Sequence, residues 1–213
     1  MYLPRHFEQN DPQALQGLIG SHPLAALVTQ GADGITADHI PLQLHPAEGE
    51  HGVLRGHVAR ANPLWKHADG QAVLALFQGP QAYISPTWYA TKAATHKVVP
   101  TWNYAVVHAH GVLRAVQDAD WLLALVQRLT TQNEAGRDPP WAVSDAPADY
   151  VAQMLRAIVG IEIRLTRLVG KWKSGQNRGE ADRNGVAAGL AQDPRLDADA
   201  LAELIRSPNQ EPV

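Results

Sequence analysis

The chain has 213 residues, no cysteine, and 18 lysines and arginines against 21 aspartates and glutamates. The lack of cysteine excludes disulfides, Cys-ligated zinc and thiol nucleophiles. The formal net charge of −3 argues against nucleic-acid binding through bulk positive charge. The longest apolar runs have six residues, whereas a membrane span needs about 20. The first eleven residues are polar and lack a signal-peptide core, so we expect a soluble, cytoplasmic protein.

The first element predicted is a short helix, with Asp11 as N-cap and Pro12 in the first turn. Pro41 indicates a free edge or a bulge in the second of the strands that follow. Asn62 and Pro63 open a brief helix between the third and fourth strands. The segments with strand composition are 24–30, 35–44, 52–59, 71–77 with 82–85, 101–116 and 161–169.

Helical periodicity appears between the later strands and in the C-terminal part. Asp118 caps a helix predicted over 119–133, a second helix is predicted over 146–159, and a short one over 199–206. Strands clustered early with helices appended late do not alternate as a doubly wound α/β fold would, and they favour a small antiparallel, Greek-key-like β-barrel. We expect one domain over residues 1–180 and a C-terminal helical tail over 181–213.

Several polar residues lie on the predicted strands near turns. Asp38 and His39 fall on opposite faces of one strand, because side chains alternate; they fit a polar edge strand as well as a site. His57, Arg60 and Asn62 lie where a strand runs into a helix. An arginine beside a helix N-terminus suits a phosphate, and an ordinary capped turn with a solvated arginine is the alternative.

His108 and His110 share one strand face, a spacing that can chelate a metal. No carboxylate or thiol joins them nearby in sequence, so two satisfied histidines are the favoured interpretation and no metal site is predicted. The sequence has no G-x-S-x-G, Walker or G-x-G-x-x-G motif, and no catalytic residue is assigned.

Aromatic and basic residues gather in three later segments, 83–89, 99–104 and 170–178. The first two combine rings with hydroxyls and suit a flat heteroaromatic ligand, although a packed barrel lid would use the same residues. The third holds three cations within eight residues together with a tryptophan and two amides. It suits an anion with a planar part, or it is a solvated basic loop.

Six blocks in series resemble the PaiB family of FMN-binding negative transcriptional regulators, over about residues 1–190. The blocks are MYLPRHF (1–7), ADHIP (37–41), GHVARANP (56–63), YISPTWY (83–89), VPTWNY (99–104) and GKWK (170–173). The resemblance implies a split β-barrel of the FMN-binding type, similar to pyridoxamine-phosphate oxidases and flavin reductases, and a homodimer with flavin at the interface.

The resemblance also implies which residues contact FMN. The phosphate is expected near Arg60 and Asn62, and the loop 171–177 is expected to come from the other subunit. The full set of residues implied in cofactor binding is Asp38, His39, His57, Arg60, Asn62, Tyr83, Ser85, Trp88, Thr101, Trp102, Asn103, Lys171, Lys173, Gln176 and Asn177.

Two positions depart from the family pattern. Ser174-Gly175 stands where the family has an aliphatic residue and then serine, and Ala90 stands where proline is common. A glycine in place of the serine removes a hydroxyl and is expected to loosen the loop. Weaker FMN binding would follow.

The leading interpretation is an FMN-binding homodimer that acts as a regulator of the PaiB type. The net charge and the absence of a DNA-reading helix argue against strong direct DNA binding, so a regulatory protein partner or the flavin redox state is the expected route. The alternative is a flavin-dependent oxidoreductase, in which the cofactor supplies the chemistry. A barrel that has lost flavin and only binds partners is a third possibility.

Overall fold

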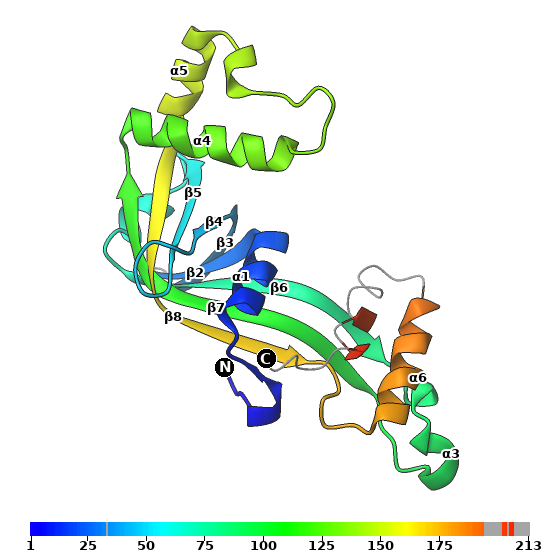
Figure 1. Cartoon of the computed structure of the whole chain (residues 1–213). Coiled ribbons are helices and arrows are strands. Elements are labelled where there is room, and N and C mark those ends of the chain that lie inside the picture. The colour runs from blue at the N-terminus through cyan, green and yellow to red at the C-terminus, as the bar shows by residue number, and fades with distance from the viewer. Residues whose placement is uncertain (33, 194–201, 204, 207–213) are drawn as a thin grey trace. The chain divides into compact units, whose positions relative to one another are not determined.

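The computed structural model describes residues 1–32, 34–193, 202–203 and 205–206. Its strands form one sheet in the order β3-β2-β6-β7-β8-β5-β4, with β1 paired to β8 (Figure 1). β2 pairs antiparallel with both β3 and β6, and β5 pairs antiparallel with both β4 and β8. The predicted class, mainly antiparallel β with appended helices, is confirmed.

Three strands, β6, β7 and β8, are much longer than the rest, with 13, 16 and 16 residues. The strands are β1 (Glu8–Gln9), β2 (Leu24–Gly31), β3 (Gly34–Pro41), β4 (Gln43–His45), β5 (Val53–Ala59), β6 (Ala72–Ile84), β7 (Thr101–Val116) and β8 (Ile158–Lys173). The α-helices are α1 (Pro12–Ser21), α2 (Leu64–His67), α3 (Thr91–Thr95), α4 (Ala119–Glu134), α5 (Ala148–Arg156) and α6 (Glu180–Ala191). Short 3-10 turns are η1 (Arg5–Phe7), η2 (Pro86–Trp88) and η3 (Val143–Asp145).

The chain divides into two compact units. The terminal unit consists of Met1–Leu18, Gln78–Val107 and Val169–Val213, and the central unit consists of Ile19–Phe77 and His108–Leu168. The strands β6, β7 and β8 contribute residues to both. None of the helices within the described ranges has the length and apolar character that a membrane-spanning segment requires.

The central unit is built on the β2–β3 hairpin and the β5–β8 pair. Leu27 and Ala25 of β2 are fully buried, whereas most of β3 is exposed. In β5, Leu54 and Val58 face the core. α4 lies against β8, because Gly160 leaves room for the Trp121 ring, which a Cβ at that position would meet. In Figure 1, α4 and α5 lie next to each other.

The terminal unit has its own apolar cluster around α6. It contains Ile84, Tyr89, Val186, Leu190 and Ile205. α6 lies in the tail predicted as helical over 181–213, but its bounds are not predicted, because its glycines and alanines give a weak apolar stripe. The glycines have a packing role, since a Cβ at Gly185 would meet the Trp88 carbonyl oxygen and a Cβ at Gly189 would meet the Trp88 ring.

Several element boundaries differ from the predictions. The segment predicted as one strand over 35–44 is two strands, because Leu42 leaves the ladder and its N–H bonds to Pro23 O at 2.9 Å. The helix predicted over 146–159 ends at Arg156, because Ile158 begins β8 and pairs with Ala59 of β5. β8 is longer than the strand predicted over 161–169, since it runs to Lys173. The segment 82–85, expected to extend or follow the fourth strand, extends it, since β6 continues through Gly79 and Pro80 to Ile84.

The remaining predictions hold or cannot be compared. Asp11 caps α1, since both of its carboxylate oxygens accept from Gln13 N and Ala14 N at 3.1 Å. Asp118 caps α4 by accepting from Trp121 N at 2.7 Å. Half of the helix predicted over 199–206 (199–201 and 204) and all of 207–213 lie outside the described residues. The proposed boundary at residue 180 stays a prediction.

Candidate functional site

Two lysines on β8 give the terminal unit a concentrated positive charge. Lys171 is only 7% exposed and Lys173 is half-buried. They are two residues apart in a strand, which places them on the same face. Within the described part of the chain, neither ammonium forms an ion pair with a carboxylate. No carboxylate of the described residues therefore neutralises their charge.

Neutral groups of the terminal unit hold both ammonium groups. Lys173 Nζ donates to Thr101 Oγ1 at 2.5 Å and to Trp102 O at 2.7 Å. Lys171 Nζ donates to Tyr2 O at 3.1 Å and lies 5.4 Å from the centre of the Tyr104 ring. Burial lowers the pKa of Lys173, and Lys171 adds to this while Tyr104 opposes it. Each lysine has three N–H donors, so both retain at least one for a ligand.

An aromatic surface adjoins the lysines on β6 and β7. The Trp102 ring is 48% exposed and lies 6.3 Å from the Tyr83 ring in an edge-on arrangement. Trp102 Nε1 donates to Gln81 Oε1 at 3.1 Å, which fixes the indole. A hollow of about 240 Å³ is lined by Gln81, Trp102 and Tyr104, among others. Positive charge beside exposed ring faces is what an anionic heteroaromatic molecule requires.

The loop after β8 is held by its own side chains. Gln176 Nε2 donates to Trp172 O at 2.6 Å, and Gln176 Oε1 accepts from Ser174 N at 3.0 Å. Gly175 has φ of +84°, in the left-handed region that favours glycine. Gly175 thus supplies the backbone turn that Gln176 closes, and the expected loosening of the loop stays a prediction. Asn177 is exposed on the same loop.

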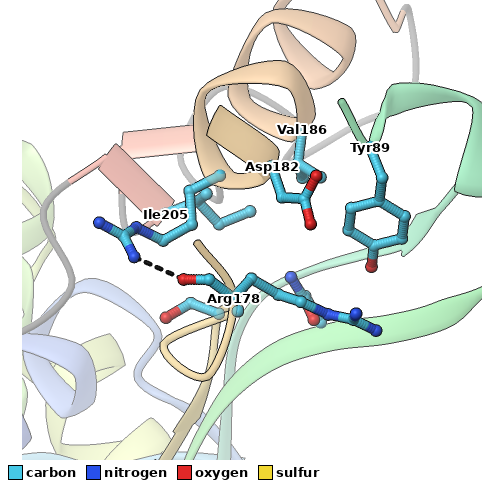
Figure 2. A pocket seen from close by; sticks show the side chains of 9 residues that line it. Tyr89, Arg178, Asp182, Val186 and Ile205 are labelled. Carbon is cyan, nitrogen blue, oxygen red and sulfur yellow. Dashed lines mark hydrogen bonds between the residues drawn. The ribbon is translucent and has the colours of Figure 1, made fainter. Parts of the chain in front are cut away.

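Asn103 is buried beneath this loop, in a small hollow of about 10 Å³ that Tyr89, Ser174 and Asp182 also line. Figure 2 shows the hollow beside α6. The Arg178 guanidinium lies 4.8 Å from the centre of the Tyr89 ring. Asp182 accepts from Thr91 N and Thr91 Oγ1, both at 2.9 Å. The hollow has the size of a single water molecule. The cofactor-binding role expected for Asn103 stays a prediction.

Two more predicted residues of the terminal unit have structural contacts. Ser85 Oγ caps η2 by accepting from Thr87 N at 3.2 Å. Trp88 packs against Gly185 and Gly189 of α6. The cofactor-binding role expected for both residues stays a prediction.

A second group of predicted residues lies in the central unit. Asn62 Nδ2 donates to Asp38 Oδ1 at 2.7 Å, and Asn62 Oδ1 accepts from Leu64 N at 2.9 Å. Asp38 and Asn62 line an open hollow of about 560 Å³ together with Thr36 and His67. The structure therefore brings Asp38 and Asn62 together, and no arginine or lysine is among the described residues that line this hollow.

Arg60 is engaged by protein acceptors. Its Nε donates to Arg156 O at 2.7 Å, and its two terminal nitrogens donate to Gln117 Oε1 at 2.8 Å and Ile158 O at 3.0 Å. Trp65 Nε1 donates to Arg60 O at 3.0 Å. These bonds use three of the five guanidinium N–H groups, so Arg60 joins separate segments of the central unit. Its role toward a phosphate stays a prediction.

The histidines of the central unit have different surroundings. His39 is exposed. His57 Nδ1 is buried and has no hydrogen-bond partner among the described residues, and burial lowers the pKa of this histidine. His110 Nε2 lies 3.1 Å from a terminal nitrogen of Arg167, which donates to it. No group of three metal-ligating side chains occurs among the residues that the structure describes.

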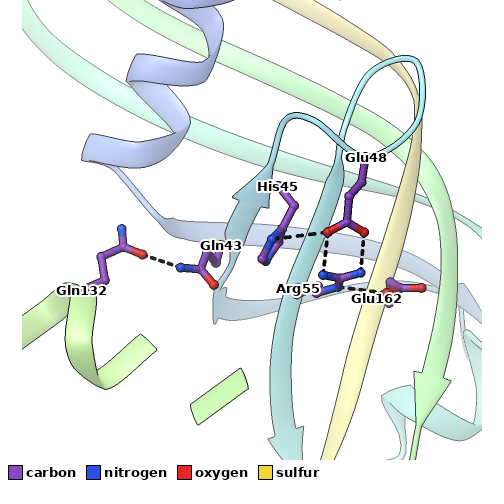
Figure 3. A network of polar contacts seen from close by, with 6 residues as sticks. All are labelled: Gln43, His45, Glu48, Arg55, Gln132 and Glu162. Carbon is purple, nitrogen blue, oxygen red and sulfur yellow. Dashed lines mark hydrogen bonds and ion pairs between the residues drawn. The ribbon is translucent and has the colours of Figure 1, made fainter. Parts of the chain in front are cut away.

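Arg55 forms the main ionic network of the central unit (Figure 3). Its terminal nitrogens donate to both Glu48 oxygens at 2.8 and 2.6 Å, and its Nε donates to Glu162 at 2.9 Å. The same network includes His45, whose Nδ1 lies 3.6 Å from Glu48. Desolvation lowers the pKa of His45, and the positive charge of Arg55 adds to it.

Sequence reasoning missed Tyr104 and Gln81 as members of the lysine–aromatic group. Tyr104 follows Trp102 by two residues in a strand, so the alternation of side chains could have placed it on the same face. Gln81 had no signal, because its pairing with Trp102 depends on how β6 and β7 lie side by side.

The sequence and fold match known proteins closely enough to assign a family. Residues 1–167 match the family described as "Putative FMN-binding domain". An uncharacterized protein of Emericella nidulans is 37% identical, covering 89% of this chain and 90% of the relative. The Protease synthase and sporulation protein PAI 2 of Bacillus subtilis is 30% identical, covering 96% of both chains.

Solved structures agree on the fold. The flavocytochrome Anf3 from Azotobacter vinelandii has a TM-score of 0.60 at 13% identity, covering 86% of this chain and 78% of that one. An FAD and heme binding protein from Mycobacterium smegmatis has a TM-score of 0.59 at 16% identity, covering 85% and 80%. These neighbours confirm the split-barrel fold of flavin-binding proteins. The chain belongs to the FMN-binding domain family that the resemblance to PaiB predicts.

Proposed function

We propose that this protein binds FMN, with the phosphate at Lys171 and Lys173 and the ring system against Trp102 and Tyr104. The observation that carries the proposal is the pair of lysines without carboxylate partners in the described residues, beside exposed aromatic faces. The family supplies the identity of the ligand. When bound, FMN would supply redox chemistry, while these residues bind and orient it.

Hydrogen bonds from a charged donor to a phosphate are stronger than those between neutral groups. Lys173 is already fixed by Thr101 Oγ1 and Trp102 O, so little side-chain entropy is lost when it binds an anion. The ring faces of Trp102 and Tyr104 add stacking for a heteroaromatic ligand.

A separate proposal concerns the predicted residues of the central unit. Asp38, Asn62, His39 and His57 offer hydrogen-bonding groups to a flavin, and Arg60 retains two N–H donors. We propose a homodimer, in which a flavin can contact groups from both copies. Light scattering with and without FMN tests this, and a monomer under both conditions would contradict it.

Comparing FMN with riboflavin tests the phosphate assignment directly. Riboflavin has the same ring and ribityl chain but lacks the phosphate. We expect flavin fluorescence quenching to show FMN binding at least about tenfold more tightly than riboflavin, because a charge-assisted bond contributes about 1.5–3 kcal/mol. Equal affinities would contradict a phosphate site at the lysines, and no binding of either would contradict the proposed function itself.

We further propose that the protein acts as a cytoplasmic regulator of the PaiB type. The relative from Bacillus subtilis supports this by its name, a protease synthase and sporulation protein. The net charge of −3 favours action through a protein partner or the flavin redox state over direct DNA binding. A gel-shift assay of the FMN-loaded protein on candidate promoters tests the direct route.

A flavin-dependent oxidoreductase is the second candidate. It is favoured by the two structural neighbours, whose names describe a flavocytochrome and an FAD and heme binding protein. The exposed Trp102 leaves the aromatic surface accessible to a second molecule. Oxidation of NADH or NADPH by the FMN-loaded protein, followed by absorbance, distinguishes the two candidates, since a regulator alone should show none.

A further inference from the structure

The central unit contains an apolar cleft that the flavin proposal does not use. It lies between α4 and α5 and has a volume of about 200 Å³. Val126 and Thr130 line it from α4, Tyr150 and Met154 line it from α5, and Trp141 lines it from the connection between the helices. Trp141, Tyr150 and Met154 are 50%, 52% and 40% exposed, so large apolar side chains stand open to solvent around a concave surface.

The connection that carries Trp141 is held in place by hydrogen bonds. Glu134, at the end of α4, accepts from Trp141 N at 3.3 Å and pairs with Arg137 at 3.3 Å through the same oxygen. Ala142 N donates to Asp145 Oδ2 at 2.8 Å, which fixes the entry to η3. The cleft is therefore a formed feature of this unit.

The lining residues define the chemistry of a ligand. None of them is charged, and the only polar atoms that their side chains carry are the hydroxyls of Thr130 and Tyr150 and the indole N–H of Trp141. Aromatic rings and a methionine sulfur make favourable contacts with another ring. Apolar clefts with a few polar groups are typical of small-molecule sites.

The size of the cleft limits the occupant. An apolar cavity of about 150 Å³ accommodates benzene, so about 200 Å³ suits one or two fused rings. A charged molecule would lose hydration without gaining a partner from the lining. We propose that the cleft between α4 and α5 binds a neutral aromatic molecule of one or two rings, as a site separate from the flavin site.

Calorimetric titration of the full-length protein with 2-naphthol, which is neutral at pH 7, tests this site. We expect saturable binding at one site per chain. The charged analogue 2-naphthoate should bind at least about tenfold more weakly, because its carboxylate finds no partner in the lining. Equal binding of the two molecules, or no saturable binding of 2-naphthol up to its solubility limit, would overturn the proposal.

Comparing the variants Met154→Glu and Gln153→Glu tests whether 2-naphthol binds in the cleft. Both residues are exposed on α5 and both variants add one carboxylate, but only Met154 lines the cleft. We expect Met154→Glu to weaken 2-naphthol binding about tenfold or more and Gln153→Glu to leave it within about twofold. Circular dichroism and FMN binding check that both variants fold. Equal weakening by both variants would overturn the proposal.

Light scattering measures the oligomeric state and so tests whether a second copy of the chain occupies the cleft instead. Loss of the wild-type oligomer in Met154→Glu, together with no 2-naphthol binding by the wild type, would assign the cleft to a contact between copies and overturn the proposal. An unchanged oligomeric state in Met154→Glu, together with lost 2-naphthol binding, supports it.

Discussion

The two units differ in the groups that contact their partly buried cations. In the central unit, Arg55 is matched by two carboxylates, Glu48 and Glu162, with bonds of 2.6 to 2.9 Å. In the terminal unit, Lys171 and Lys173 contact carbonyls, a hydroxyl and aromatic rings. A neutralised cation stabilises the fold, whereas a cation held by neutral groups keeps its charge for a ligand.

The difference separates stability from binding. Replacing Arg55 should lower the free energy of unfolding without affecting flavin binding. Replacing Lys173 should weaken flavin binding and change the free energy of unfolding little. The neutral contacts of Lys173 contribute less to stability than bonds to a bound phosphate contribute to affinity. The four predictions that follow test this contrast.

The largest effect is expected for Arg55→Met. The variant leaves Glu48 and Glu162 without their shared partner, and Glu162 is only 18% exposed at its side chain. We expect the free energy of unfolding to fall by about 3 kcal/mol. Urea denaturation measures it, and FMN affinity of the folded variant should be unchanged. A loss of FMN affinity would mean that the network also supports the flavin site.

Lys173→Met tests the other side of the contrast. Removing the ammonium should weaken FMN by about 2 kcal/mol, or about thirtyfold, and leave riboflavin binding nearly unchanged. Lys92→Met is the matched control, since Lys92 is an exposed lysine of the same unit. Equal losses for FMN and riboflavin would indicate a damaged fold and not a lost phosphate contact.

Arg60→Ala decides whether this arginine belongs to the fold or to the cofactor. Its three bonds to Gln117, Arg156 and Ile158 predict a loss of about 1–2 kcal/mol in the free energy of unfolding. We expect the FMN dissociation constant to change less than for Lys173→Met. Fluorescence quenching measures both dissociation constants. A larger loss of FMN affinity in Arg60→Ala than in Lys173→Met would support the phosphate position near Arg60 that the resemblance implies.

The smallest effect concerns His57. Burial lowers its pKa from the ordinary value of 6.5, so just below that pH the unfolded chain binds more protons than the folded one. Stability therefore falls as the pH drops below 6.5. We expect His57→Gln to reduce this fall by up to about 1 kcal/mol in urea denaturation at pH 7.5 and 5.5. The exposed His39→Gln serves as the control, and equal slopes for wild type and His57→Gln would contradict the assignment.

The sequence predicts most strands because their signals are local. Alternation, turn residues and caps locate β2, β5, β7 and α4 within a few residues. The bounds of α5 fail, because Ile158 and Val159 suit either a helix or a strand and the pairing with β5 decides. The bounds of α6 are not predicted within the tail expected to be helical, since its glycines give a weak pattern and pack against Trp88.

The candidate site is predicted less completely than the fold. Residue types and spacing indicate Lys171, Lys173 and Trp102 as site residues. The sequence does not tell which polar side chains form their hydrogen bonds within the protein. Gln176 and Ser85 bond to their own loops, a choice that depends on backbone geometry. The contact between the Tyr104 ring and Lys171 joins two different strands, so the sequence alone does not predict it.

The contact of Trp88 with α6 couples three positions by volume. A side chain at residue 185 would meet the backbone at Trp88, and one at residue 189 would meet the indole. A smaller side chain at position 88 would leave space for a side chain at 189. It would leave none at 185, because the backbone carbonyl of residue 88 blocks that position. In homologous chains, we therefore expect residue sizes at 88 and 189 to compensate one another, while 185 admits only glycine wherever this helix docks in the same way.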